Sequence, residues 1–455
     1  MENAQEKKFR LMTETPVKPL VCRLAVPTII SMLVSAFYNM ADTFFVGQLG
    51  TSESAAVGVV FSLMAIIQAV GFFFGHGSGN FISRALGRHD NDTAQEMAAT
   101  GFFSALIAGA VIMGFGLIFL RPLARWLGST ETILPYAVDY MRIILIGAPY
   151  MTASLVLNNQ LRFQGNAAYA MVGITSGAVL NIALDPLLIF VLNMGIAGAA
   201  LATIISQFVS FVLLLFGTYR GSSIPIRISC FRPRRALYKE IVRGGAPSLL
   251  RQGLGSVATI CLNLAAGAYG DAAIAGMSIV TRIMQFANSC LIGFGQGFQP
   301  VCGFNYGAKK FSRVKEAFWF CVKLSTAVLI VLAIVGFIFA PQIVSVFRDD
   351  PAVIDVGTIA LRMQCVTFPL AAWIVMCNMM TQTIGKALPA SFLAMARQGL
   401  FFIPAVLLLP RLFGIFGVEL SQPIADIISF AFAVPLEISV LREMKEEPEP
   451  LNKAA

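Results

Sequence analysis

The chain of 455 residues is 57% hydrophobic and 13% charged and carries a formal net charge of +9, with a mean hydropathy of +0.76. Apolar runs of about 20 residues that do not alternate in polarity indicate an all-α polytopic membrane protein and exclude both a soluble globular domain and a transmembrane β-barrel. The eight cysteines are scattered singly and there are only two histidines, so neither a disulfide framework nor a zinc site is expected.

The first predicted element follows a polar, basic segment at 1–23 and is too long to be the core of a cleavable signal peptide. Hydropathy predicts twelve membrane-spanning helices in all. They cover residues 20–47, 54–79, 98–120, 133–157, 169–192, 197–217, 240–266, 273–302, 316–340, 355–384, 390–410 and 414–440. Most lysines and arginines outside these spans fall on the side of the two termini. The positive-inside rule therefore predicts a multi-pass protein of the cell membrane with both termini in the cytoplasm.

The basic excess includes three arginines in the central loop, Arg232, Arg234 and Arg235. On the cytoplasmic side of a membrane such residues face anionic lipid headgroups. The positive net charge is therefore a topology signal, and we expect the lipid bilayer rather than a nucleic acid as the partner of this surface.

The second half of the chain repeats the first with an offset of 220 residues, which superimposes Pro27 on Pro247 and Asn158 on Asn378. The same offset pairs Gly50 with Gly270, Gly75 with Gly295, Gly77 with Gly297, Gly87 with Gly307 and Gly165 with Gly385. Because each half has six spans, both halves enter the membrane in the same orientation, which makes the repeat parallel, as in rocking-bundle transporters. We predict two six-helix lobes, 1–217 and 240–455, the second ending in a charged tail, joined by a basic cytoplasmic linker at 218–239.

The first span carries a polar stripe on one helical face, formed by Ser31, Ser35, Tyr38 and Asp42. Asp42 lies about eight residues before the turn at Gly50, which places it roughly 12 Å below the outer surface at the rise of an α-helix. In the repeat, Asp42 falls opposite Leu262, so this acid belongs to the first lobe alone.

The fifth span contributes a second acid. Asn181 and Asp185 lie four residues apart and therefore share a face, and Pro186 removes a backbone donor directly behind the acid. Asp185, in the fifth span, and Thr203, in the sixth, each lie about eight residues from the outer turn that joins these two spans. Asp42 lies about as far from the outer turn at Gly50. Three helices therefore bring polar groups to one depth in the membrane. Asp185 has no acidic counterpart in the second lobe, because Ala405 occupies the equivalent position.

An ionisable side chain within a membrane span costs at least about 2.5–3.5 kcal/mol and by default marks a pathway or relay. Two carboxylates close together in a medium of low dielectric cannot both ionise cheaply, so the pair can hold one H⁺, or one Na⁺ with help from neighbouring oxygens. The structural alternative is that a protonated Asp185 only donates a hydrogen bond to a neighbouring helix.

Other polar positions are weaker candidates. Gly71, Gly75 and Gly79 form a small-residue ladder that predicts close helix packing. In the second lobe Arg251, Gln252 and Asn263 are candidates for the wall of a hydrated cavity. In the first lobe Asn158 either lines this cavity or caps the end of a helix. The acids of the second lobe lie on the last span, and they are Glu419, Asp426 and Glu437.

Several segments together resemble the multidrug and toxic compound extrusion (MATE) family over nearly the whole chain. They are LAVPTII at 24–30, YNMADTFFVGQLG at 38–50, LRFQGNAAYAM at 161–171, NIALDPLLIF at 181–190, GIAGAALATIISQ at 195–207 and GGAPSLLRQ at 244–252. The resemblance implies twelve helices in two lobes that expel cationic or amphipathic compounds in exchange for H⁺ or Na⁺. The acid of the first span and the Asn-x-x-x-Asp of the fifth are similar to the DinF-like and MepA-like branch. That similarity implies functional positions at Pro27, Tyr38, Asp42, Asn181, Asp185 and Thr203.

We therefore interpret the chain as a secondary antiporter rather than an enzyme, monomeric, with small organic molecules as substrates and no cofactor besides the coupling H⁺ or Na⁺. Asp42 and Asp185 would carry that ion, with Asn181, Thr203 and Tyr38 tuning them, and Na⁺ would bind at the two acids and Asn181. Pro27 would let the first helix bend between states.

A lipid-linked oligosaccharide flippase is the alternative function. It shares the two-lobe plan, and Arg251, Arg282 and Arg397 of the second lobe could grip a pyrophosphate.

Overall fold

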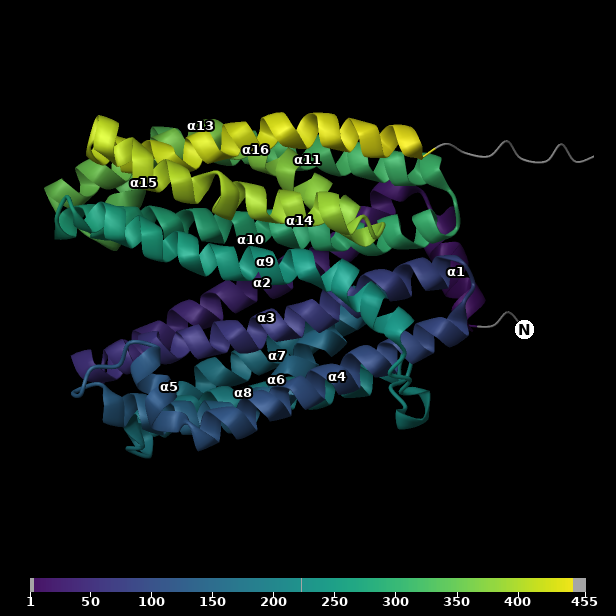
Figure 1. Ribbon diagram of the computed structural model, residues 1–455, viewed down its shortest axis with the longest axis horizontal. Helices are drawn as coiled ribbons and strands as arrows, with labels where there is room; N and C mark the ends of the chain where they lie inside the picture. The colour runs from purple at the N-terminus through teal and green to yellow at the C-terminus, as the bar shows by residue number, and fades with distance from the viewer. Residues whose placement is uncertain (1–3, 222, 445–455) are drawn as a thin grey trace, which may run out of the picture.

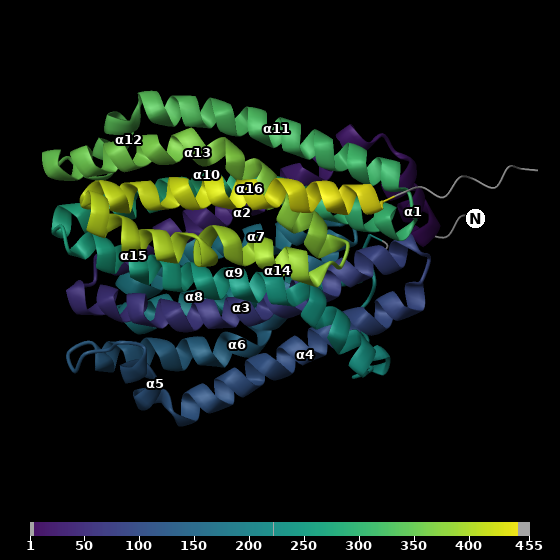
Figure 2. The same cartoon turned by 45° about the horizontal axis from the view of Figure 1, so that its top comes forward.

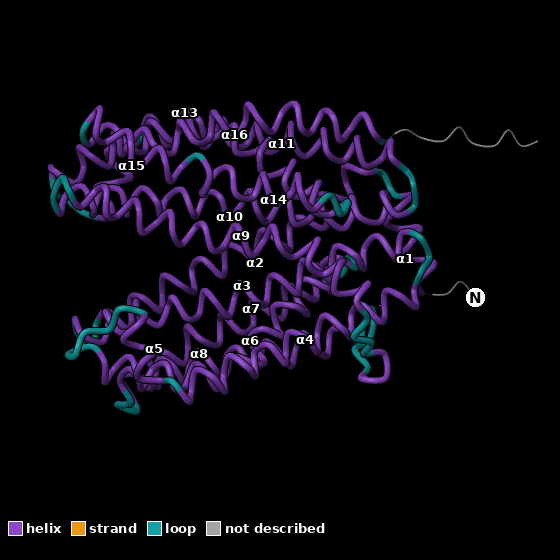
Figure 3. Tube along the Cα trace, viewed as in Figure 1, coloured by secondary structure: helices purple, strands orange, loops and turns teal. Residues whose placement is uncertain are grey.

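The computed structural model describes residues 4–221 and 223–444, so the predicted charged tail lies outside the described residues. All regular secondary structure in these ranges is helical (Figure 3). The first half contains α1 (Ala4–Glu14), α2 (Val17–Gly47), α3 (Thr51–Gly87), α4 (Asn91–Ile118), α5 (Leu120–Trp126), α6 (Leu134–Phe163), α7 (Ala167–Pro186), η1 (Leu187–Val191) and α8 (Gly195–Thr218). The second half contains η2 (Ile228–Cys230), α9 (Arg235–Gly267), α10 (Asp271–Gly307), α11 (Phe311–Ile338), α12 (Ala340–Phe347), α13 (Pro351–Thr383), α14 (Ala387–Met395), η3 (Ala396–Leu400), α15 (Phe402–Phe413) and α16 (Ile415–Glu443).

The predicted twelve-helix membrane fold is confirmed. In the described ranges, eleven helical segments are long and apolar enough to cross a membrane. The twelfth is α10, which is long enough but carries amides along its length and packs between α2 and α13. Several helices run beyond the predicted spans: α3 continues from the predicted end at 79 to Gly87. The extension carries Asn80, Ser83 and Arg84, which hydropathy assigns to water but which the structure buries between the two halves.

The helices form two groups, α2–α8 and α9–α16, which lie one above the other in Figure 1. The two groups meet at the end of the bundle that holds α1 and the last turn of α16, which we call the terminal end, and they diverge toward the opposite end (Figures 1 and 3). Figure 2, turned by 45°, shows that helices of both groups run along the same long axis. The groups are the two lobes expected from the repeat.

Glycines of α3 and α10 make close backbone contacts between the lobes. A Cβ at Gly77 would lie 2.4 Å from the carbonyl oxygen of Ile241, and one at Gly297 would lie 2.5 Å from the backbone of Ala25. Farther toward the terminal end, Gly87 packs against the carbonyl oxygen of Phe304. Its repeat mate Gly307 packs against the carbonyl oxygen of Arg84 in the same way. The last two contacts are related by the 220-residue offset, because Gly87 and Phe304 are the repeat mates of Gly307 and Arg84. Here the two lobes meet about a pseudo-two-fold axis, and only glycine permits backbones to approach so closely.

The glycine ladder packs against α6, as predicted. A Cβ at Gly71, Gly75 or Gly79 would meet the side chain of Leu155, Asn159 or Phe163 respectively, at 2.2–2.8 Å. The ladder residues and their partners both recur every four residues, so α3 and α6 lie nearly parallel along one face. These glycines bring helices together and line no site of their own.

Helix α1 spans the junction of the lobes at the terminal end. On the first lobe, the ring of Phe9 packs against that of His89 in a tilted arrangement, at a ring-centroid distance of 3.9 Å. On the second lobe, Asn305 donates to the carbonyl of Met12 at 3.0 Å, and Lys310 donates to the carbonyl of Thr13 at 3.3 Å. The sequence predicted only a polar, basic segment here, because the helix is too short and too charged to show in a hydropathy profile.

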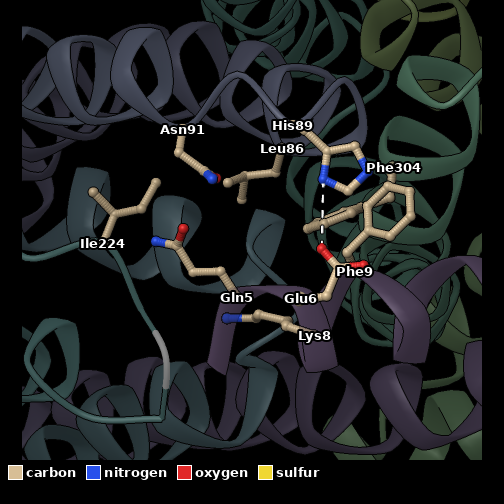
Figure 4. A pocket seen from close by; sticks show the side chains of 9 residues that line it. All are labelled: Gln5, Glu6, Lys8, Phe9, Leu86, His89, Asn91, Ile224 and Phe304. Carbon is tan, nitrogen blue, oxygen red and sulfur yellow. Dashed lines mark ion pairs between the residues drawn. The ribbon is translucent and has the colours of Figure 1, made fainter. Parts of the chain in front are cut away.

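A small pocket lies beside α1, with side chains from both lobes and from the linker around it (Figure 4). Glu6 and His89 face each other across it at 3.8 Å, the one ion pair drawn there. The pocket is lined by Gln5, Glu6, Lys8, Phe9, Leu86, His89, Asn91, Ile224 and Phe304. It is far from the acids of the first lobe, and it marks the place where α1 closes the terminal end.

Candidate functional site

Asp185 is the centre of a buried polar cluster in the first lobe. Its side chain is 0% exposed. The amide nitrogen of Asn181 donates to Asp185 Oδ2 at 2.9 Å, and the amide oxygen accepts from the backbone N–H of Thr203 at 3.2 Å, in the orientation that satisfies both groups. Asn181, Asp185 and Thr203 therefore lie together in the structure, from α7 and α8.

The backbone changes immediately after this acid. α7 ends at Pro186, and Leu187–Val191 form a π-helical segment in which the N–H of Leu192 donates to the carbonyl of Leu187 at 2.9 Å. Proline lacks the N–H that an α-helix would use at this point, and π-helical insertions of this kind recur at functional sites. Pro186 thus disturbs the helix beside Asp185, as expected from the sequence.

Asp42 and Tyr38 of α2 face the same cluster. Asp42 is close enough for its charge to act on Asp185. Tyr38 lies near Thr203 and near both acids. Asp42 is half-buried whereas Asp185 is fully buried, so Asp42 is the more accessible of the two acids.

Two polar neighbours of the cluster were missed by sequence reasoning. Tyr140, on α6, is buried and lies near Thr203. Gln207, one turn beyond Thr203 on α8, lies near Tyr38. A helical wheel of α8 would have placed Gln207 beside Thr203, but no local pattern singles out one tyrosine of the fourth span.

The two carboxylates are short of partners. One oxygen of each acid, Asp42 Oδ1 and Asp185 Oδ1, is buried without a hydrogen-bond partner in the part of the chain that the structure describes. A buried oxygen without a donor is costly, so this arrangement favours an added H⁺ or cation.

Pro27 lies inside α2 between two close contacts with the second lobe. Ala25, two residues before it, touches Gly297, and Ile29, two residues after it, touches Gly293. Thr28 also donates across the interface, to the carbonyl of Gly293 at 2.6 Å. Any bending of α2 at Pro27 would therefore act directly on the contact between the lobes.

The other predicted positions lie on helices of both lobes. Ser35 is half-buried on α2. The amide of Asn158 donates to the carbonyl of Ala170 at 3.2 Å and fastens the start of α7; its repeat mate Asn378 does the same to Ala390 at 2.7 Å. On α9, Gln252 is half-buried and Asn263 is exposed. Arg251 points to Asn378, to which it donates at 3.3 Å.

The second lobe has a nearly buried ion pair between η3 and α16. Arg397, in the π-helical segment η3, donates to Asp426 of α16 at 2.8 Å, and the Asp426 side chain is only 3% exposed. Gln422 donates to the same carboxylate oxygen at 2.9 Å. Glu419 and Glu437 are buried and hold carboxylate oxygens without a hydrogen-bond partner among the described residues. Asp426 therefore neutralises Arg397, which the sequence analysis named as a possible pyrophosphate ligand.

The comparisons with known proteins agree with the internal repeat. The family model described as MatE matches residues 27–187 and 247–407. The multidrug export protein MepA of Staphylococcus saprophyticus is 28% identical over 421 residues, which cover 92% of this chain and 93% of that protein. MepA of Staphylococcus aureus is 26% identical over 441 residues, with coverage of 96% and 97%.

Solved structures of similar fold cover almost the whole chain. A crystal structure of a MATE protein in complex with MaL6 gives a TM-score of 0.91 at 27% identity, covering 97% of this chain and all of the other. A MOP superfamily transporter from Pyrococcus furiosus gives 0.90 at 27% identity, with coverage of 97% and 99%. An outward-facing multidrug resistance transporter gives 0.90 at 28% identity, with the same coverage.

Proposed function

This chain belongs to the MatE family, and from that premise we propose that it is a secondary multidrug exporter that moves cationic or amphipathic organic compounds out of the cell in exchange for an inward flow of H⁺ or Na⁺. Relatives that align over more than nine-tenths of the chain are named multidrug export proteins. The predicted topology, with both termini in the cytoplasm, makes the terminal end the inner one.

One observation carries the coupling part of the proposal: two acids of the first lobe share a buried, apolar site, and each keeps an oxygen without a partner. Such a pair binds a cation far more readily when it is sealed from water than when bulk solvent already stabilises the charge. Ion binding then favours one arrangement of the helices over another, which is the differential affinity that coupling requires. Half-buried Asp42 would receive the ion, and Asp185 would hold it.

The orientation of Asn181 supports H⁺ as the coupling ion. In the orientation that satisfies its hydrogen bonds, the Asn181 nitrogen donates to Asp185 and the Asn181 oxygen accepts from the backbone N–H of Thr203. Na⁺ in proteins is bound by oxygen atoms alone, so in this arrangement Asn181 would have to turn away from Thr203 to serve as a ligand.

Closure at the terminal end supports alternating access. Besides the glycine contacts, Arg84 of α3 forms an ion pair with Glu240 of α9 at 2.9 Å, and donates to the carbonyl of Thr383 at 2.6 Å. α1 adds its own contacts across the same junction. We infer that this conformation is sealed toward the cytoplasm and that transport requires these contacts to break.

The test is efflux of a fluorescent cationic dye from proteoliposomes under an imposed H⁺ gradient, an imposed Na⁺ gradient, or neither. We expect export only with the H⁺ gradient. Export driven by Na⁺ alone would replace H⁺ by Na⁺ in the proposal, and equal export without any gradient would refute secondary antiport.

In the flippase alternative, one of the three arginines proposed to bind a pyrophosphate is already neutralised by an acid. Arg397 is engaged by Asp426, and Arg282 lies exposed on α10. No contact in the described part of the chain brings Arg251 together with either of them, so a pyrophosphate grip of this composition has no structural support.

A further inference from the structure

A second polar cluster lies at the junction of the lobes, and the proposed transport cycle does not use it. Arg162, at the end of α6, is 1% exposed. Its guanidinium donates to Gln299 Oε1 at 3.0 Å, to Asn159 Oδ1 at 2.6 Å and to the carbonyl of Gln296 at 3.4 Å. Arg251, on α9 of the other lobe, lies close enough for its charge to act on Arg162.

Neither arginine forms an ion pair within residues 4–221 and 223–444. Arg162 donates to two side-chain amide oxygens and one backbone carbonyl. Arg251 donates to the side-chain oxygen of Asn378 at 3.3 Å. Two other arginines of the described chain do have carboxylates: buried Arg84 pairs with Glu240, and half-buried Arg397 pairs with Asp426. Two like charges without a counter-charge are unfavourable in a buried interface, and a guanidinium cannot shed its proton to escape the cost.

The cluster has more donors than acceptors. Arg162 Nε and Gln299 Nε2 are buried donors without a hydrogen-bond partner among the described residues. The oxygens of the surrounding amides, by contrast, already accept from the two arginines. On the adjoining side, His76 Nδ1 shares a hydrogen bond of 2.9 Å with Ser248, which also accepts from Gln382 at 2.8 Å. A ligand that only accepts hydrogen bonds and carries negative charge would satisfy this site.

We propose that Arg162, Arg251 and Gln299 bind a monovalent anion, either chloride or the carboxylate of an organic solute. Arg162 belongs to the first lobe, and Arg251 and Gln299 belong to the second, so an anion between them ties the lobes together in the closed arrangement of the terminal end. Arg251 is only half-buried, which leaves a route for the anion to enter. The proposal does not rest on the proposed drug export, because an anion can bind here whatever the protein transports.

The experiment measures anion binding by thermal unfolding of the purified full-length protein in nanodiscs. Sodium methanesulfonate, which lacks a carboxylate, is replaced stepwise by sodium chloride or sodium acetate at constant ionic strength, pH and Na⁺ concentration. A ligand that binds only the folded state raises the melting temperature in a saturable way. We expect saturation with chloride, acetate or both. Saturation with chloride identifies an inorganic anion site, and saturation with acetate alone identifies a carboxylate site.

Two variants locate the site, and a third serves as the control. Arg162→Gln and Arg251→Gln should each lower the apparent anion affinity by about tenfold or more, since each removes a charge-assisted donor. Arg251→Gln keeps the test decisive should Arg162→Gln fail to fold, because Arg251 is half-buried. Arg142→Gln, on the exposed face of α6, should bind as the wild type does. The proposal is overturned if the wild type shows no saturable effect, or if Arg251→Gln keeps wild-type affinity.

Discussion

Replacing Asp185 by asparagine should abolish gradient-driven export while leaving the fold intact. The side chain is fully buried, and its Oδ2 accepts the one hydrogen bond that the carboxylate makes, from Asn181 at 2.9 Å. In Asp185→Asn the new amide oxygen can take the place of Oδ2 and keep this bond. The new nitrogen takes the place of Oδ1, which has no partner among the described residues. The expected cost in the free energy of unfolding is therefore no more than about 1 kcal/mol.

The expected functional loss is much larger. A shift of a two-state equilibrium from 1:99 to 99:1 requires about 5.5 kcal/mol of differential ion binding, and the amide cannot take up a proton to supply it. We expect coupled export to fall by at least about 100-fold. Asp42→Asn should do the same, and the double variant should be little worse than either single one, because residues that act as a unit are not additive.

The assay is dye efflux from proteoliposomes under an H⁺ gradient, with melting temperatures recorded on the same preparations. Asp139→Asn, at an exposed position of α6, is the matched control and should export normally. Asp426→Asn is unsuitable as a control because it would leave Arg397 unpaired in a nearly buried site. Full coupled export by Asp185→Asn protein would refute the acid pair as the coupling site.

Three further predictions concern the contact between the lobes and the linker. Pro27→Ala should slow export without weakening dye binding, since it restores a backbone donor and stiffens α2 between its two contacts with α10; unchanged export rates would argue against bending there. Glu240→Gln should weaken the ion pair with Arg84 by about 1–2 kcal/mol, given its partial exposure, and shift spin-label distances across the terminal end toward open conformations by about tenfold in population. Neutralising the linker arginines should leave export per inserted molecule unchanged, and a large loss with normal insertion would show that the linker binds a ligand. These arginines are Arg232, Arg234 and Arg235.

The sequence alone determined the membrane fold, the repeat and the acids of the first lobe. Helical spans depend on the transfer of about 20 residues into lipid, a property of local composition, and the repeat is visible as matching glycines and prolines. Asn181 and Asp185 could be placed together because helical spacing is a local rule. Thr203 could be placed at their depth because the helix rise converts residue number into distance.

Only the tertiary structure decided which side chains meet across helices and across lobes. Arg397 and Asp426 are 29 residues apart, and no sequence pattern indicates that they pair. Helix packing nevertheless brings them together as an ion pair. Arg162 reaches Gln299 in the other lobe for the same reason. Such contacts depend on how far each helix is rotated and displaced against its neighbours, which close packing at glycines determines and which no single helix encodes.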